Sequence, residues 1–168
     1  MIAFDELLAQ AQRSAVHLEM RDSYMLDDPT FVAWQRGETM DPVEQWRPWV
    51  ELVQAALARG VAIRRARIIS EPVSAYVRWE YETTTMNVEA GEQVRWLPRR
   101  RATDIPLPGN DFWLFDDSPV LVNHFDGNGQ KPDLGYELID DDPTLAKLCA
   151  SAFEAVWERA IPHEEYRP

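Results

Sequence analysis

The stretch VAIRRARIIS, Val61–Ser70, contains the clearest strand pattern in the chain, because β-branched residues recur along it. A helix is predicted to start at Pro72 and to run through Glu80, and the polar stretch Asn87–Glu92 is interpreted as a turn. Val94–Leu97 predicts the next strand. Strands of a β-α-β unit are commonly neighbours, so we expect these two strands to lie close together in one sheet.

Two apolar runs follow this unit, Phe112–Phe115 and Val120–Phe125, and the turn residues Asp116–Pro119 separate them. This order predicts a β-hairpin. Tyr136–Ile139 predicts a last strand. Asp142-Pro143 is typical of a helix start and predicts a closing helix.

The residues before this β-α-β unit show mainly helical patterns. Phe4–Gln12 predicts a short helix, and His17–Tyr24 is a strand or an extended connection. Pro29 and the Asp41-Pro42 pair each predict a helix start, with Gly37 and Gly60 as the respective ends. The segment at 161–168 is expected at the surface.

These elements predict an α/β (α+β) fold in which helices cover a mixed sheet. A chain of 168 residues suits a single domain over 1–168, with a mainly helical part at 1–60 and the sheet with its closing helix at 61–168. The sequence leaves the oligomeric state open.

The chain is acidic, with a formal net charge of −12. A strongly acidic protein repels phosphate backbones, so we expect no direct nucleic-acid partner. The charge is uneven, since residues 59–101 carry a net charge of +4. The lone cysteine, Cys149, lies in an apolar run and is expected to be an inert core residue. The chain shows neither a signal peptide nor a membrane span, so a cytoplasmic location is expected.

Arginine side chains are the best candidates for a binding site. Arg65 and Arg67 share one face of the strand Val61–Ser70, and Arg95 and Arg99 lie on or just past the next strand. Guanidinium groups suit phosphates and carboxylates, so these four predict a site for a small anion. The alternative is a network of ion pairs with nearby acids, namely Glu71, Glu80 and Glu92.

Acidic and histidine side chains suggest a second, hydrolytic possibility. Glu19, Asp111, Asp116 and His124 are secondary candidates for a metal-assisted or phosphodiesterase-type site. Their simpler interpretation is turn, cap and surface chemistry. His163 is expected to be solvated. The chain contains no phosphate-binding glycine loop and no nucleophile elbow, so we predict no cofactor and no resident metal.

Several stretches resemble an actinobacterial family of unknown function, whose members are encoded near helix-turn-helix regulators. The stretches are LE-x-RD-x-Y (Leu18–Tyr24), RIISEPVSAYVRWE (Arg67–Glu80), NVEAGEQVRWLPR (Asn87–Arg99), DFWLFD (Asp111–Asp116) and FEAVWERAIP (Phe153–Pro162). The resemblance implies a helix-turn-helix regulator or another protein as partner.

The chain also looks like phospholipase-D-type domains that serve as regulatory modules. Active members carry His-x-Lys and then, after four more residues, Asp. With Asp116 in the Asp place, Asp111 stands where Lys would be and Gly109 where His would be. Without an imidazole nucleophile no phosphoenzyme forms, so the resemblance implies a non-catalytic regulatory or ligand-sensing domain.

Overall fold

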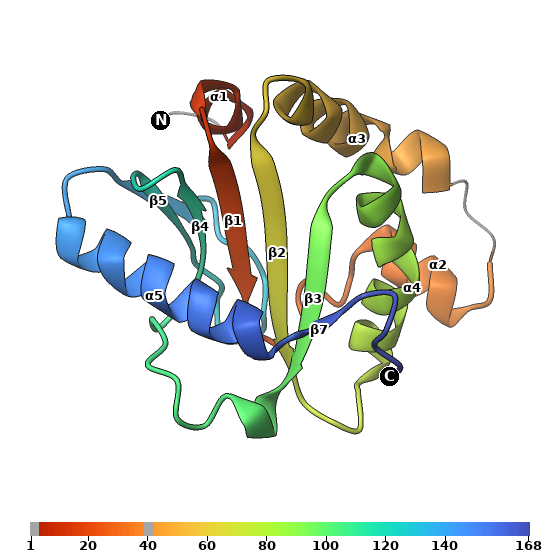
Figure 1. Ribbon diagram of the computed structural model, residues 1–168. Helices are drawn as coiled ribbons and strands as arrows, with labels where there is room; N and C mark the ends of the chain where they lie inside the picture. The colour runs from red at the N-terminus through yellow and green to blue at the C-terminus, as the bar shows by residue number, and fades with distance from the viewer. Residues whose placement is uncertain (1–3, 39–41) are drawn as a thin grey trace.

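The computed structural model describes residues 4–38 and 42–168, and at its centre lies a sheet of seven strands in the order β6-β5-β4-β1-β2-β3-β7 (Figure 1). In chain order the strands are β1 Ser14–Glu19, β2 Ala62–Ile69, β3 Gln93–Pro98, β4 Asp111–Phe115, β5 Val120–Asn123, β6 Tyr136–Ile139 and β7 Ile161–Pro162. β1, β2 and β3 are parallel, and the remaining pairings are antiparallel. The mixed sheet confirms the predicted α+β class and the predicted hairpin.

Helices cover both faces of this sheet. In the described part of the chain they are α1 Phe4–Gln10, α2 Pro29–Gln35, α3 Pro42–Ala58, α4 Ala75–Ala90 and α5 Pro143–Arg159. α5 lies on one face, where Phe153 and Val156 pack with Leu18 and Ile68 of the strands (Figure 1). α1 and α3 pack on the other face, and α4 lies beside α3 and contacts β3.

The alternation of β2 directs Arg64 toward α5, where it pairs with Glu154, and directs Arg65 and Arg67 toward the opposite face. This is the arrangement that the sequence pattern predicts. β1 begins three residues earlier than expected and lies between β4 and β2. Asp41, the expected cap of α3, lies outside the described residues.

The turn predicted at Asn87–Glu92 is wrong, because α4 continues to Ala90. The Asn87 amide is buried and donates to Glu92 Oε2 at 2.8 Å. The polar side chain that suggested a turn is therefore satisfied by a buried hydrogen bond. Gly91, with φ of 104°, ends the helix in the left-handed conformation that suits glycine. The helix also begins at Ala75, with Ser74 as its N-cap, rather than at Pro72.

The expectation of a surface segment at 161–168 holds only in part, and the expectation that His163 is solvated is wrong. β7 pairs with β3, and both His163 and Tyr166 are buried. His163 Nδ1 accepts a hydrogen bond from Trp96 Nε1 at 3.1 Å, and Tyr166 stacks on the same indole. These contacts bury the large apolar ring of Trp96 and give its N–H an acceptor. The polar residues of the segment do not indicate this packing. Among the described residues, no helix is both long and apolar enough to span a membrane.

Candidate functional site

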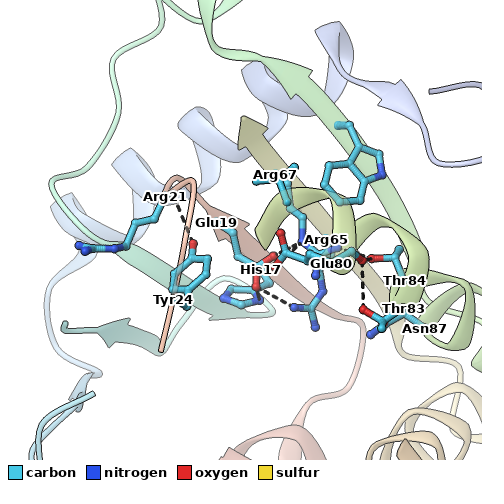
Figure 2. A network of polar contacts seen from close by, with 12 residues as sticks. His17, Glu19, Arg21, Tyr24, Arg65, Arg67, Glu80, Thr83, Thr84 and Asn87 are labelled. Atoms are coloured by element: carbon cyan, nitrogen blue, oxygen red, sulfur yellow. Dashed lines mark hydrogen bonds and ion pairs between the residues drawn. The ribbon is translucent and has the colours of Figure 1, made fainter. Parts of the chain in front are cut away.

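Two arginines of β2 lie side by side in the interior, on the face of the sheet opposite α5 (Figure 2). Arg65 Nε donates to Glu92 Oε1 at 2.6 Å, and its Nη1 donates to Glu19 Oε1 at 2.9 Å. Arg67 donates to the other oxygen of Glu19, and Glu80 Oε1 lies 3.4 Å from its Nε. Glu19 therefore bridges both guanidinium groups.

Further polar side chains surround these ion pairs. Thr84 accepts from Arg67, and Asp111 accepts from Tyr24 Oη. We refer to the following residues as the central polar cluster: His17, Glu19, Arg65, Arg67, Glu80, Glu92, Asp111 and Asn123. The side chains of Glu19, Arg65 and Glu80 are only 12%, 10% and 10% exposed, so the cluster lies almost wholly in the interior.

Tryptophans line the guanidinium groups. The Arg65 guanidinium carbon lies 5.5 Å from the Trp49 ring centroid and 5.4 Å from that of Trp113. The Arg67 carbon lies 4.9 Å from the Trp96 ring. Cation–π attraction and the exclusion of water strengthen the charge interactions inside these walls.

The cluster has more carboxylates than cations. Glu19, Glu80 and Glu92 pair with the two arginines, whereas Asp111 accepts from Tyr24 and from the backbone of Met20. Burial, reinforced by the negative charge of Glu19, raises the pKa of Glu80 to about 7. Burial likewise raises the pKa of Asp111 to about 6. At Glu19, burial alone would raise the pKa, but Arg67 and Arg65 outweigh it and lower the pKa below its usual range. Glu80 and Asp111 are therefore the surplus acids, and they take up protons near neutral pH.

His17 and Asn123 lie at the side of the cluster that faces β5. The His17 ring stacks on Trp113, with centroids 4.2 Å apart, and its Nε2 is 3.3 Å from Asn123 Nδ2. Both residues are 6% exposed. Burial lowers the pKa of His17 well below its usual value, so the ring is neutral at physiological pH.

One polar atom on each of these two residues has no hydrogen-bond partner among the described residues, namely His17 Nδ1 and Asn123 Oδ1. The nearest acid, Glu19, places Oε1 3.6 Å from His17 Nδ1, which is beyond hydrogen-bond range. Turning the Asn123 amide by 180° would only exchange which of its ends lacks a partner. A buried polar atom without a partner costs about 1–3 kcal/mol, so this pair marks a place where a bound molecule would be stabilised.

The four arginines of the predicted anion site do not converge. Arg65 and Arg67 pair with acids in the cluster, and Glu80 and Glu92 are two of the partners that the alternative interpretation names. The third, Glu71, pairs with Arg100 instead.

The other two arginines lie elsewhere. Arg95 points to the opposite face, where its Nη1 donates to the carbonyl of Trp157 at 3.0 Å. Arg99 lies past the end of β3, and its Nη2 donates to the carbonyls of Met20 and Ile68. The set thus falls into three separate places.

The hydrolytic candidates are also spread out. Glu19 and Asp111 belong to the cluster, whereas His124 lies after β5 and pairs with Glu137 on β6 at 2.8 Å. Asp116 caps the start of β1. Across residues 4–38 and 42–168, no group of three or more histidine, cysteine or acidic side chains is arranged to hold a metal ion.

Asp116 stabilises the start of β1, and we expect Asp116→Ala to lower the free energy of unfolding by about 1–2 kcal/mol. Its carboxylate accepts from the backbone N–H groups of Gln12, Arg13 and Ser14 at 2.7–3.0 Å, and alanine removes all three acceptor contacts. Urea unfolding measures the loss. The neighbouring Asp117→Ala is the control, because the Asp117 side chain is 89% exposed. Equal effects of the two substitutions would contradict this role.

Sequence reasoning missed Asn123 and the three tryptophans that line the arginines. A signal for Asn123 was present, since it is a polar residue on the same face as Leu121 within an apolar strand. The tryptophans carry no such signal, because a ring in the core and a ring over a guanidinium look alike in sequence.

The fold and the cluster define an α+β domain that buries a charged network against the middle of its mixed sheet. The chain belongs to the family described as Domain of unknown function (DUF6879), whose model matches residues 2–168. This confirms the expectation of a family of unknown function.

A search among curated proteins finds no match. Among solved structures, a chain of TrmBL2, an archaeal chromatin protein whose structure is reported to show a novel mode of DNA binding, is similar with a TM-score of 0.49 and 13% identity. The alignment covers 93% of this chain and 47% of that chain, so this chain spans about half the length of that structure.

This comparison requires one correction. The expectation of no direct nucleic-acid partner rested on the net charge of the whole chain, and the similar chain comes from a DNA-binding protein. We therefore withdraw that exclusion, because net charge does not describe how charge is distributed over a surface. At this level of similarity the comparison assigns no DNA binding to this chain.

Proposed function

We propose that this chain is a non-catalytic, ligand-sensing domain whose ligand binds at the central polar cluster, beside His17 and Asn123. The observation that carries the proposal is the pair of buried polar atoms without partners on these two residues. A ligand that bonds to both atoms would remove their desolvation cost.

The charge of the cluster indicates the class of ligand. The cluster holds four acids and two arginines, and burial, with the negative charge of Glu19 beside it, keeps the pKa values of Glu80 and Asp111 raised. A small molecule with an amine or guanidine group would neutralise the surplus and donate hydrogen bonds to Asn123 Oδ1. Trp113, which stacks on His17 and also borders Arg65, forms the aromatic wall beside these two residues.

The regulatory setting is a proposal too, and the sequence resemblances support it. The likeness to non-catalytic phospholipase-D-type modules, with Gly109 and Asp111 in the places of the catalytic pair, supports sensing rather than hydrolysis. The likeness to an actinobacterial family encoded near helix-turn-helix regulators supports a cytoplasmic regulatory system with such a protein as partner. The net charge of −10 over residues 102–168 would suit a basic partner surface, and we propose one domain over 1–168.

We expect a cationic ligand to raise the melting temperature of the purified chain. The probes are spermidine, agmatine and lysine as cations, glucose as a neutral compound and citrate as an anion. A ligand at 100 times its Kd stabilises the folded state by about 2.7 kcal/mol, and each kcal/mol corresponds to about 2–4 °C at this size. Differential scanning fluorimetry measures the shift.

Asn123→Ala should abolish the shift, because it removes the acceptor inside the cluster. Asn128→Ala is the matched control, since Asn128 is exposed in the turn after β5. The comparison uses the shift within each variant, so a lower starting melting temperature of Asn123→Ala does not affect it. Failure of every cationic probe, or an undiminished shift in Asn123→Ala, would overturn the proposal.

A further inference from the structure

A cavity of about 340 Å³ lies beyond the carboxyl ends of the parallel strands β2 and β3, apart from the central polar cluster. Its lining consists of Ser70, Glu71, Pro98, Arg99, Arg100 and Thr103. Open sheets with parallel strands commonly bind ligands outside the carboxyl ends of those strands. The position and the two arginines make this cavity a candidate binding site.

Arg99 is held in a fixed orientation at the wall of the cavity. Its Nε donates to Ser70 Oγ at 3.1 Å, and its Nη2 donates to the carbonyls of Met20 and Ile68 at 2.7 and 3.0 Å. Its Nη1 donates to no residue in the described part of the chain, and the side chain is 40% exposed. One end of the guanidinium is therefore anchored, and the other end is available to a ligand.

Arg100 is more loosely held. Its Nη2 lies 3.2 Å from Glu71 Oε2, and its side chain is 79% exposed. Glu71 also accepts from Tyr166 Oη at 3.1 Å, so the carboxylate keeps a second partner when Arg100 moves. Because the Arg100 side chain is largely exposed, its ion pair with the partly buried Glu71 is weak, and a doubly charged anion would compete with Glu71 for Arg100.

The local charge supports an anion. Two arginines, Arg99 and Arg100, line the cavity against one carboxylate of the lining, Glu71, while Asp22 pairs with Arg99 from outside the lining. This is an excess of cations in a chain whose net charge is −12. Two arginines that approach from neighbouring positions suit the several oxygens of a tetrahedral dianion better than the two oxygens of a carboxylate.

We propose that this cavity binds a phosphate group, either as inorganic phosphate or as the phosphomonoester of a small molecule, through Arg99 and Arg100. Glu71 competes for the site, because it holds Arg100 while the cavity is free of anion. The proposal stands apart from the ligand site at His17 and Asn123, since the two share no residue.

Isothermal titration of the full chain with inorganic phosphate, at pH 7.5 and low ionic strength, tests the site. We expect saturable binding that Arg100→Gln weakens about tenfold, since a charge-assisted hydrogen bond is lost. Glu71→Gln should tighten binding severalfold, because the amide no longer competes for Arg100. Arg47→Gln is the control, because Arg47 forms an exposed ion pair with Glu44 on α3.

Two further arms identify the ligand chemistry. Glucose 6-phosphate should bind at least as tightly as inorganic phosphate, whereas acetate should bind more weakly than either. Absence of saturable phosphate binding would overturn the proposal, and so would an equal loss in Arg47→Gln and Arg100→Gln. Unchanged binding in Glu71→Gln would overturn the role of Glu71 as a competitor. None of these results depends on the amine probes used for the central polar cluster.

Discussion

Replacing Arg67 with methionine is expected to lower the free energy of unfolding by about 3–5 kcal/mol. Methionine fills much of the volume but removes the charge that faces Glu19 and Glu80. Both carboxylates would then remain buried without this partner, and Thr84 would lose its donor. Domains of this size are typically stable by about 5–15 kcal/mol, so the loss is a large part of the total.

Urea unfolding at pH 7 measures this loss, and Arg64→Met is its matched control. Arg64 lies on the same strand but on the opposite face, where it pairs with Glu154, whose side chain is 51% exposed. We expect Arg64→Met to cost about 1 kcal/mol or less. Similar losses in the two variants would show that removing Arg67 from the cluster destabilises the protein no more than breaking a surface ion pair does.

The second large effect is a dependence of stability on pH that originates at Glu80. Its pKa in the folded protein is about 7, against an ordinary value of 4.5, so the folded state holds this proton more tightly than the unfolded chain does. Between pH 4.5 and 7 the folded state binds more protons, and stability therefore falls as pH rises through this window. Asp111, with a pKa raised to about 6 from 3.8, acts in the same direction between those two values.

Glu80→Gln removes the contribution of Glu80, since glutamine stays neutral at every pH. At pH 8 we expect the variant to exceed the wild type in stability by about 3 kcal/mol, because the rise of the Glu80 pKa from 4.5 to about 7 corresponds to about 1.36 kcal/mol for each pH unit. Near pH 4.5 the two proteins should be equally stable, because Glu80 is then protonated in the folded state.

Urea unfolding of both proteins at pH 5, 6, 7 and 8 gives the comparison. Glu89→Gln serves as the control, because Glu89 is exposed on the same helix. Its free energy of unfolding should change with pH in parallel with that of the wild type. If Glu80→Gln also runs parallel to the wild type, Glu80 does not titrate in this window. The same titration matters for sensing, since a cation bound at the cluster would favour the ionised forms of Glu80 and Asp111 and would release protons near neutral pH.

The local elements of this fold follow from short stretches of sequence. The strand β2, the hairpin of β4 and β5, the strand β6 and the start of α5 at Asp142-Pro143 lie where the pattern predicts them. These features depend on neighbours within a few residues, such as alternation along a strand or a carboxylate that caps the next turn. Alternation also predicts that Arg65 and Arg67 share a face.

The site depends on contacts that no local pattern contains. Arg65 meets Glu19 across 46 residues of sequence, and His17 meets Asn123 across 106. Several interpretations were open for Arg65, Arg67, Arg95 and Arg99 because the sequence does not reveal which acids surround each one. The placement of β1 between β4 and β2 decided that Glu19 joins the arginines.

The sequence alone therefore determined the class of fold, the faces of the strands and the absence of the standard catalytic motifs, because these depend on local periodicity and residue type. Only the tertiary structure decided which charges neutralise one another, which acids are left in surplus and which buried polar atoms lack a partner. Those properties are sums over all the charges and solvent that surround a group, and most of these neighbours come from distant parts of the chain.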